Sequence, residues 1–238
     1  MTTTNDSIEQ SETKQQVREE IVNQIVEWAT RLRKKKINIL TLPGIGWHFE
    51  NELVKACKKK GIEVSGVGFE YNANKPRIWD EMNSNCPDGF EAANKSIHGW
   101  SDKESRKFDV AWFDFCGYPD RDRMETVKGF MRSHPVCLVY ATFSLAIREY
   151  GGAKQMAKEI FPFGNSVPSV AVAVRKRLWF DVRFHNENEE NVKEIMHLMY
   201  AGGERQVTAM ITLGYQSGKV KHLTPFDADW DTPLREQR

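Results

Sequence analysis

The stretch Ile37-Asn-Ile-Leu-Thr-Leu-Pro-Gly-Ile-Gly46 decides the fold. Its first six residues are mostly apolar, which is typical of a strand buried on both faces. A Pro-Gly-Ile-Gly turn follows, and residues 47–60 then carry apolar side chains at helical spacing. Residues 62–69 form a second apolar run that we expect to be a strand. Strand, glycine turn, helix and strand in this order predict a βαβ unit, and therefore a parallel sheet with a right-handed crossover.

Upstream of this unit, the sequence predicts one amphipathic helix. Apolar residues recur there every three or four positions, at Val17, Ile21, Ile25, Trp28 and Leu32. We expect residues 1–13 to form a disordered tail and residues 14–36 to form the N-terminal helix. The cations from Arg31 to Lys36 at the end of this helix complement the negative end of its dipole, or alternatively contact phosphate groups.

Downstream, buried strands are predicted at 108–114 and 135–143, where apolar residues are almost continuous. Helical spacing predicts helices at 74–83, 118–132, 151–161 and 191–200. Residues 84–94 are predicted to be a loop, residues 96–100 a short strand, and the alternating segments 178–184 and 206–215 antiparallel strands. No linker or repeat divides the chain, so we expect one α/β domain over residues 37–221 and a polar tail over residues 222–238.

Composition excludes several classes of protein. The 238 residues contain 34 Lys and Arg against 33 Asp and Glu, so the net charge of +1 favours neither nucleic acid nor membrane over the whole molecule. The 4 Cys residues form no Cys-x-x-Cys pair or Cys/His cluster, so buried free thiols are favoured and no metal site is expected. An apolar signal core and an 18-residue apolar run are both absent, so we expect a cytoplasmic protein rather than a secreted or membrane one.

In an open parallel sheet, ligands bind outside the carboxyl ends of the strands, and the first two predicted strands both end in suitable residues. Pro43, Gly44 and Gly46 would let the backbone approach a ligand closely at the start of a helix, although the third glycine of a dinucleotide fingerprint is missing and a plain turn is equally consistent. Glu70 lies 24 residues beyond Gly46, close to the spacing at which an acid binds ribose hydroxyls. An ordinary surface glutamate is the alternative for Glu70.

Two further turns carry candidate residues. Trp100, Ser101 and Asp102 offer a ring and polar groups for an adenine, or else form an ordinary loop. Asp114 ends a predicted buried strand and is followed by Phe115. Burial of a carboxylate costs free energy unless it is paired or hydrogen-bonded, so Asp114 is expected to contact a partner or ligand. A capping or loop-pinning role is the alternative for Asp114.

The order of these features resembles a class I S-adenosylmethionine-dependent methyltransferase, over residues 39–143. The resemblance implies a three-layer Rossmann-like domain, with a mostly parallel sheet, an antiparallel C-terminal hairpin and the N-terminal helix as an extension. It implies S-adenosylmethionine as the cofactor, bound by Pro43, Gly44, Gly46, Glu70, Trp100, Ser101 and Asp102. It also implies catalytic roles for Asp114, as hydrogen-bond acceptor from an amine, and for Phe115, which would stack on a planar substrate.

The sequence departs from the family pattern at two places. The family usually carries an acid before the glycines, where this chain has Thr41 and Leu42. At Asp114 the chain reads Asp-Phe-Cys-Gly instead of Asp-Pro-Pro-Tyr. These departures keep open a catalytically inactive methyltransferase-like protein that senses the cofactor or binds nucleic acid, and another Rossmann-type enzyme that uses a nucleotide.

The expected methyl acceptor is a nucleic-acid base. Three basic runs favour it, from Arg31 to Lys36, from Lys58 to Lys60 and from Arg175 to Arg177, the last followed by Leu178 and Trp179. Cations beside aromatic rings suit single-stranded or flipped bases. Solvated helix faces whose cations are balanced by nearby acids are the alternative.

Overall fold

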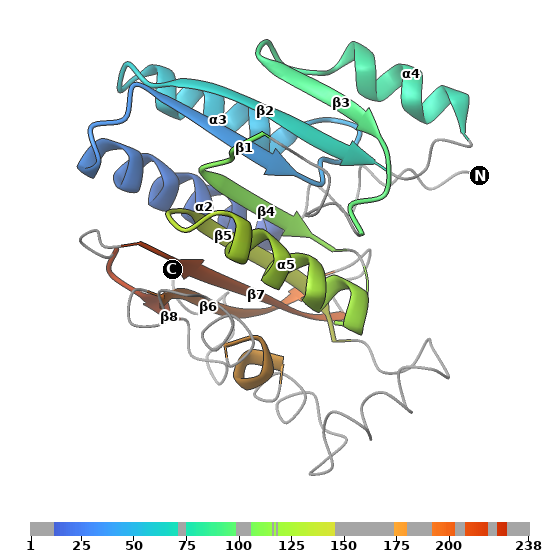
Figure 1. The fold of residues 1–238 in the computed structure, drawn as a ribbon. Helices are drawn as coiled ribbons and strands as arrows, with labels where there is room; N and C mark the ends of the chain where they lie inside the picture. Colours follow the sequence, from blue (N-terminus) through green and yellow to red (C-terminus); the bar gives the residue numbers. More distant parts are fainter. Residues whose placement is uncertain are drawn as a thin grey trace.

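One eight-stranded sheet organises the computed structural model (Figure 1). The structure describes residues 12–70, 75–98, 106–115, 117, 119–145, 174–179, 192–202, 208–218 and 223–227. The strands are β1 (Lys36–Thr41), β2 (Glu63–Glu70), β3 (Phe90–Asn94), β4 (Val110–Asp114), β5 (Leu138–Ser144), β6 (Lys193–Gly202), β7 (Thr208–Gln216) and β8 (Phe226–Asp227). Their order across the sheet is β3-β2-β1-β4-β5-β7-β6-β8. Strands β1 to β5 are parallel, whereas β7 runs antiparallel to both β5 and β6.

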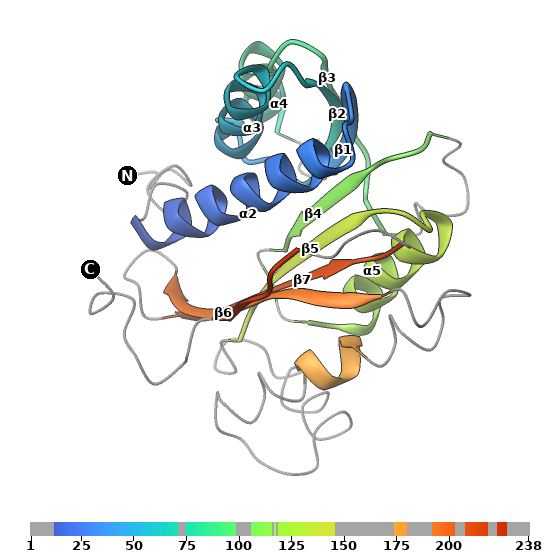
Figure 2. The same cartoon turned by 90° about the vertical axis from the view of Figure 1, so that its left-hand side faces the viewer.

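Helices cover both faces of the sheet and make the domain three layers thick (Figure 2). Helices α2 (Glu12–Arg31), α3 (His48–Lys58) and α4 (Pro76–Ser84) lie on one face, and α5 (Arg121–Ser133) lies on the other. Each face has its own apolar cluster: Ile37 and Ile39 of β1 pack with the α2 side, whereas Leu40 packs with the α5 side. The predicted three-layer domain with a βαβ start is therefore confirmed.

The predicted helix at 191–200 is wrong, because residues 193–200 belong to strand β6. Ile195, Met196 and Leu198 pack on the α2 side of the sheet and Met199 packs on the α5 side. A strand buried on both faces has a nearly continuous apolar sequence, which periodicity does not distinguish from a buried helix. The antiparallel C-terminal hairpin is confirmed, but its strands are β6 and β7.

Other local predictions also differ from the structure. The loop predicted at 84–94 contains the edge strand β3, whose Phe-Glu-Ala-Ala-Asn sequence has little strand propensity and is paired with β2 on one side only. Residues 96–98 form no strand, and residues 178–179 are helical. The helix predicted at 151–161 lies outside the described residues, as does most of the predicted N-terminal tail. None of the described helices is long and apolar enough to cross a membrane.

Helix α2 is joined to the sheet by its apolar stripe and by one buried polar side chain. Val17, Ile21, Ile25 and Trp28 are all buried against the sheet face. Midway along the helix, Gln24 accepts a hydrogen bond from the Tyr140 hydroxyl at 3.0 Å and donates one to the Ile195 carbonyl at 3.2 Å. Burial raises the pKa of the Tyr140 phenol well above its usual value, so the hydroxyl keeps its proton and donates.

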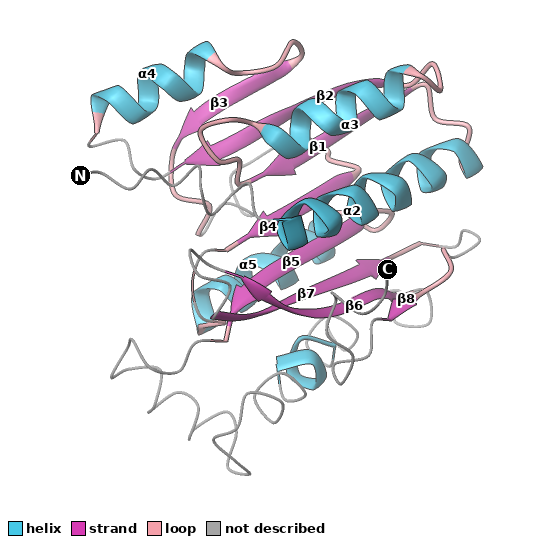
Figure 3. Ribbon diagram, turned by 180° about the vertical axis from the view of Figure 1, so that it is seen from behind, coloured by secondary structure: helices cyan, strands magenta, loops and turns pink. Residues whose placement is uncertain are grey.

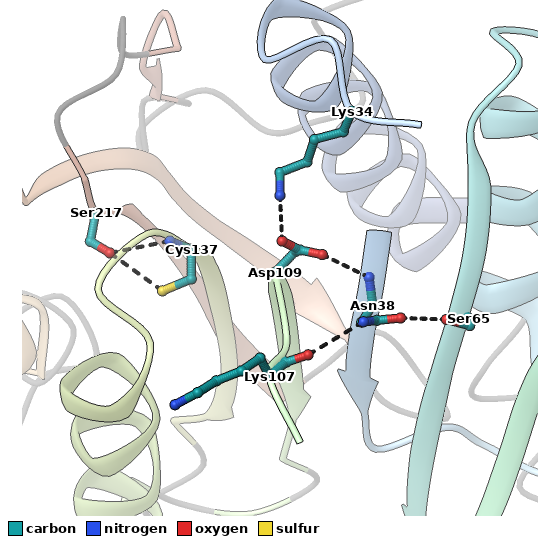
Figure 4. Close-up of polar contacts among 7 residues, drawn as sticks. All are labelled: Lys34, Asn38, Ser65, Lys107, Asp109, Cys137 and Ser217. Carbon is teal, nitrogen blue, oxygen red and sulfur yellow. Dashed lines mark hydrogen bonds and ion pairs between the residues drawn. The ribbon is translucent and has the colours of Figure 1, made fainter. Parts of the chain in front are cut away.

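A polar network at the amino ends of the strands joins the end of α2 to β1 and β4 (Figure 4). Lys34 Nζ lies 2.5 Å from Asp109 Oδ1, and the other carboxylate oxygen of Asp109 accepts the backbone N–H of Asn38 at 2.9 Å. The Asn38 side chain accepts the Ser65 hydroxyl of β2. The Asp109 carboxylate therefore pairs with a lysine that follows α2 and accepts a backbone N–H from β1.

We expect Gln24→Ala to lower the free energy of unfolding by about 1–3 kcal/mol, because the Tyr140 hydroxyl and the Ile195 carbonyl lose their buried partner. Urea denaturation measures the change. Gln15→Ala is the matched control on the same helix, since the hydrogen bond of Gln15 to Glu19 is exposed to water. Equal losses in the two variants would contradict the anchoring role of Gln24.

Candidate functional site

The site lies where the chain direction across the sheet reverses. Strands β1 and β4 are neighbours at the centre of the sheet. From β1 the chain continues outward to β2 on one side, whereas from β4 it continues outward to β5 on the other. At such a switch point the loops after the two strands diverge and leave a crevice at their carboxyl ends. A pocket occupies this place, and the side chains and backbone around it belong to Lys14, Arg18, Leu42, Pro43, Gly44, His48, Phe49, Glu50, Trp112 and Asp114.

The glycine loop between β1 and α3 is held by Trp47. The Trp47 backbone donates to the Gly44 carbonyl at 3.2 Å and adopts a left-handed conformation with φ of 48°. Its indole is fully buried and donates to the Met82 carbonyl at 2.9 Å. A Cβ on Gly68 of β2 would lie 2.4 Å from the Pro43 ring and 2.5 Å from the Trp47 ring, so glycine is required there for the loop to pack on the sheet. The hydrogen bonds of Trp47 and the close packing on Gly68 therefore hold the loop against the sheet.

The predicted residues of this loop have different surroundings. Pro43 and Gly44 line the pocket. Gly46 is not among the residues that line it, and a Cβ on Gly46 would lie 2.5 Å from the His48 imidazole. Pro43 and Gly44 are therefore the parts of the loop that a ligand in this pocket would contact.

Four charged side chains from three parts of the chain meet at the pocket. Lys14 Nζ of α2 lies 2.9 Å from Asp114 Oδ2 at the end of β4, with side chains only 15% and 14% exposed. Figure 3 shows the first turns of α2 beside the carboxyl end of β4. Arg18, one helical turn after Lys14, is 6% exposed, and Glu50 in the first turn of α3 is 2% exposed. The pocket thus combines two buried charges, Arg18 and Glu50, with the partly buried ion pair of Lys14 and Asp114.

Sequence inspection identified only Asp114 of these four. A signal for the others was present in the spacing: Lys14 and Arg18 are four residues apart beside the apolar stripe of α2, and Glu50 follows the glycine turn by one helical turn. Spacing along the chain does not reveal which helix end lies at which strand end, so these residues were missed.

Behind Asp114, a chain of buried hydroxyl groups connects the strand ends. The Trp112 indole donates to Thr142 Oγ1 at 3.2 Å, and Thr142 Oγ1 lies 2.9 Å from Thr212 Oγ1. Thr212 lies 3.5 Å from the Tyr200 hydroxyl. Burial, together with the nearby charge of Asp114, raises the pKa of Tyr200 to about 12, so this phenol is protonated at neutral pH. The groups of this network are therefore uncharged at neutral pH.

The other predicted site residues lie apart from the pocket or outside the described residues. Glu70 is the last residue of β2, opposite Asn94 of β3, and does not line the pocket. Phe115 is 4% exposed, and its ring stacks on Phe113 at 5.7 Å and on Phe143 at 5.5 Å, so the ring belongs to the core. His98 and the Arg123 guanidinium also lie against this ring, at 6.3 and 5.9 Å. Trp100, Ser101 and Asp102 lie outside the described residues.

Several cations of the predicted nucleic-acid surface are paired with acids. Arg31 pairs with Glu27, and Lys36 lies 2.7 Å from Glu63. Lys34 belongs to the Asp109 network described above. These pairs agree with the alternative of balanced, solvated faces. Lys36 and Glu63 are the first residues of β1 and β2, at the edge of the sheet opposite to the pocket.

In the third basic run, from Arg175 to Arg177, the first residue is also paired with an acid. Arg175 makes a two-point contact with Glu194 of β6, at 2.5 and 3.1 Å, and lies 3.1 Å from the His197 ring. Lys176 and Arg177 are exposed on the same helical segment. Arg175 therefore joins this segment to the sheet.

Comparison with known proteins identifies the fold. No protein-family model and no curated protein matches the sequence. The plantazolicin methyltransferase BamL, solved with a triazolic desmethylPZN analogue and SAH, superposes with a TM-score of 0.53 at 8% identity, over 90% of each chain. A putative sarcosine dimethylglycine methyltransferase from Galdieria sulphuraria superposes with a TM-score of 0.51 at 10% identity, over 85% of this chain and 86% of that one. The chain has the Rossmann-like fold of S-adenosylmethionine-dependent methyltransferases, as the order of its motifs predicted.

We expect Lys14→Met to lower the free energy of unfolding by about 1–3 kcal/mol, because Asp114 loses its cation in a mostly buried position. Lys36→Met is the matched control: its ion pair with Glu63 is more than half exposed, and we expect a loss of no more than about 1 kcal/mol. Urea denaturation of both variants checks the difference. A larger loss for Lys36→Met would show that the pocket charges are not coupled to folding.

Proposed function

We propose that this chain transfers the methyl group of S-adenosylmethionine to an acceptor held beside Asp114. One observation carries the proposal: the Pro43-Gly44 loop after β1 and the Asp114 carboxylate after β4 line the same pocket at the switch point of the sheet. The fold alone does not establish an activity, because many functions share one architecture. The support therefore comes from the glycine loop and the carboxylate together.

The residues around the pocket fit the proposed cofactor. Pro43 and Gly44 bring backbone close to the pocket, and the N-terminus of α3 lies just beyond them. The Thr41 hydroxyl at the end of β1 is buried and has no hydrogen-bond partner among the described residues, so a polar atom is available beside the loop. We assign Glu70 to the ribose hydroxyls and Trp100, Ser101 and Asp102 to the adenine.

S-adenosylmethionine, when bound, supplies a methyl group activated by its attachment to a sulfonium. The protein's part is to orient the acceptor and to exclude water. Asp114 accepts a hydrogen bond from the acceptor's amine and so directs the nitrogen lone pair. Lys14, which holds this carboxylate at 2.9 Å, has to share it or leave. Phe115 supports Asp114 from the core: its backbone N–H donates to the Thr142 carbonyl at 3.1 Å.

The acceptor in this proposal is a nucleic-acid base. Support comes from exposed cations at Arg33, at Lys35 and in the run from Lys58 to Lys60. The Lys35 carbonyl accepts the Glu63 N–H, so the first group lies next to the chain segment that follows the second. This surface lies at the amino ends of the strands. A strand of nucleic acid bound there would have to extend around the domain to reach Asp114.

A second candidate function is cofactor sensing without transfer. The ion pair between Lys14 and Asp114 favours it, because the proposed catalytic carboxylate is already occupied by a cation of the same chain. The missing acid at Thr41 and Leu42 agrees with weakened catalysis.

Calorimetric titration of the full chain with S-adenosylmethionine, S-adenosylhomocysteine, NAD and ATP tests the cofactor. We expect both sulfur compounds to bind and Glu70→Ala to weaken them by about tenfold or more, because the ribose loses a charged partner. Binding of NAD or ATP alone would instead support a nucleotide-dependent enzyme. Binding by no compound would contradict the proposal.

Transfer of a labelled methyl group to DNA, RNA and protein tests the role of Asp114. Asp114→Asn is expected to reduce transfer by about 100-fold or more, as for the loss of a positioned acid or base. Asp109→Asn is the matched control, since Asp109 also pairs with a lysine next to β4 but at the opposite edge of the sheet. Cofactor binding with no transfer to any acceptor would favour the sensor, and unchanged transfer by Asp114→Asn would exclude Asp114.

Fluorescence anisotropy with single-stranded DNA and RNA between 50 and 200 mM salt tests the acceptor class. We expect binding to weaken steeply with salt, and the triple variant Lys58→Gln, Lys59→Gln, Lys60→Gln to bind less tightly with a shallower slope. Lys75→Gln with Arg77→Gln is the control, because these two exposed cations, at the N-cap and in the first turn of α4, lie outside the basic runs. An affinity that does not change with salt, or that both variants reduce equally, would contradict nucleic-acid binding by this surface.

A further inference from the structure

We propose that Arg123 is a positioning residue, which holds the loop after β4, residues 114–117, in the conformation that presents Asp114 to the acceptor. This inference rests on the proposed function, and it names what replaces the two prolines of Asp-Pro-Pro-Tyr. Proline fixes the backbone angle φ and so stiffens a loop by itself. Because this chain has Phe115 and Cys116 at those two positions, the rigidity of its loop has to come from contacts with other elements.

Backbone hydrogen bonds join the loop to β5. The Phe115 N–H donates to the Thr142 carbonyl at 3.1 Å, and the Gly117 carbonyl accepts the Ser144 N–H at 3.0 Å. Thr142 and Ser144 both belong to β5, the neighbouring strand in the sheet. These two bonds hold the loop against the end of that strand.

The guanidinium of Arg123, in the first turn of α5, lies over the same loop. Its central carbon is 5.9 Å from the centre of the Phe115 ring, within the range of a cation–π contact. A Cβ on Gly117 would lie 2.7, 2.9 and 3.2 Å from Nη2, Cζ and Nη1 of Arg123. Since three atoms of this flat group would lie at similar short distances, the group faces Gly117. One side chain therefore contacts two residues of the loop.

Arg123 is itself held at the start of α5. Asp120, the N-cap of the helix, accepts the Arg123 N–H at 2.9 Å and forms an ion pair with its guanidinium. The helix packs on the sheet through Val127 and Phe130, both fully buried. Because Asp120 compensates the charge of Arg123, the guanidinium is better suited to positioning the loop than to binding an anionic ligand.

The position of the loop matters for the proposed reaction. Misplacing a reacting group by about 1 Å can cost about 100-fold in rate. Asp114 directly precedes Phe115, so a movement of the loop also moves its carboxylate. Pro43 and Gly44, which line the pocket, belong to a different loop. Loss of the Arg123 contact is therefore expected to slow transfer and to leave cofactor affinity unchanged.

Methyl transfer from labelled S-adenosylmethionine to DNA, RNA and protein, with calorimetry of S-adenosylhomocysteine, tests this role. Arg123→Met is expected to lower kcat by about tenfold or more and to keep the affinity for S-adenosylhomocysteine within about twofold. Hydrogen exchange gives a second readout: we expect faster exchange at the Phe115 and Ser144 amides, which make the two hydrogen bonds of the loop. Arg121→Met, at an exposed arginine of the same helical turn, is the matched control and should change none of these quantities.

Gly117→Ala tests the contact from the other side and keeps the test available if Arg123→Met does not fold. Its added Cβ would displace the guanidinium, which is the end of a flexible side chain. We expect Gly117→Ala to lower kcat as Arg123→Met does, and the double variant to lower it no further, because both changes remove one contact.

Three results would overturn the inference and leave the proposed function standing. They are unchanged kcat and exchange in folded Arg123→Met, additive losses in the double variant, and an equal loss of kcat and of S-adenosylhomocysteine affinity. The last result would indicate general damage to the fold instead of a displaced loop. Absence of transfer by the wild type to any acceptor would overturn the proposed function, and the inference with it.

Discussion

The ion pairs that hold α2 to β4 at its two ends are the constraint on which the rest of the structure depends. Lys14 meets Asp114 at the carboxyl end of the strand, and Lys34, just after the helix, meets Asp109 at the amino end. Between them, the apolar stripe of α2 and the hydrogen bonds of Gln24 join the helix to β5 and β6. Because both ends are held, the first turns of α2 have only one place to lie, which is beside the switch point of the sheet.

The two ion pairs use the same residue types and have different consequences. Asp109 is saturated by Lys34 and by the backbone N–H of Asn38, so it closes a structural network. Asp114 lies beside the glycine loop, where Arg18 and Glu50 add two more buried charges. A charge in a closed network contributes to stability alone, whereas the same charge at the edge of a pocket is available to a ligand. The surroundings of the two carboxylates, and not their chemistry, separate structure from proposed function.

The parts of the fold that were predicted correctly are those whose secondary structure is determined by the pattern of residues within one short segment. The strand, glycine turn, helix and strand over residues 37–69 follow from alternating periodicities within one short segment. Strand β6 was predicted as a helix because it carries buried apolar side chains on both faces of the sheet, Ile195, Met196 and Leu198 on one and Met199 on the other. Only its position between β7 and β8 makes this segment a strand. Strand β3 was missed because its pairing with β2 stabilises a sequence that has little preference for a strand.

The candidate site divides in the same way. The amino-acid sequence by itself determined the glycine turn at Pro43 and Gly44 and the carboxylate of Asp114, since each follows directly from a predicted strand end and each lines the pocket. Only the tertiary structure decided that Lys14, Arg18 and Glu50 surround Asp114, and that Phe115 belongs to the core. The physical reason is that periodicity reports which face of an element is buried, whereas the packing of α2 against distant strands decides which charged residues share a pocket.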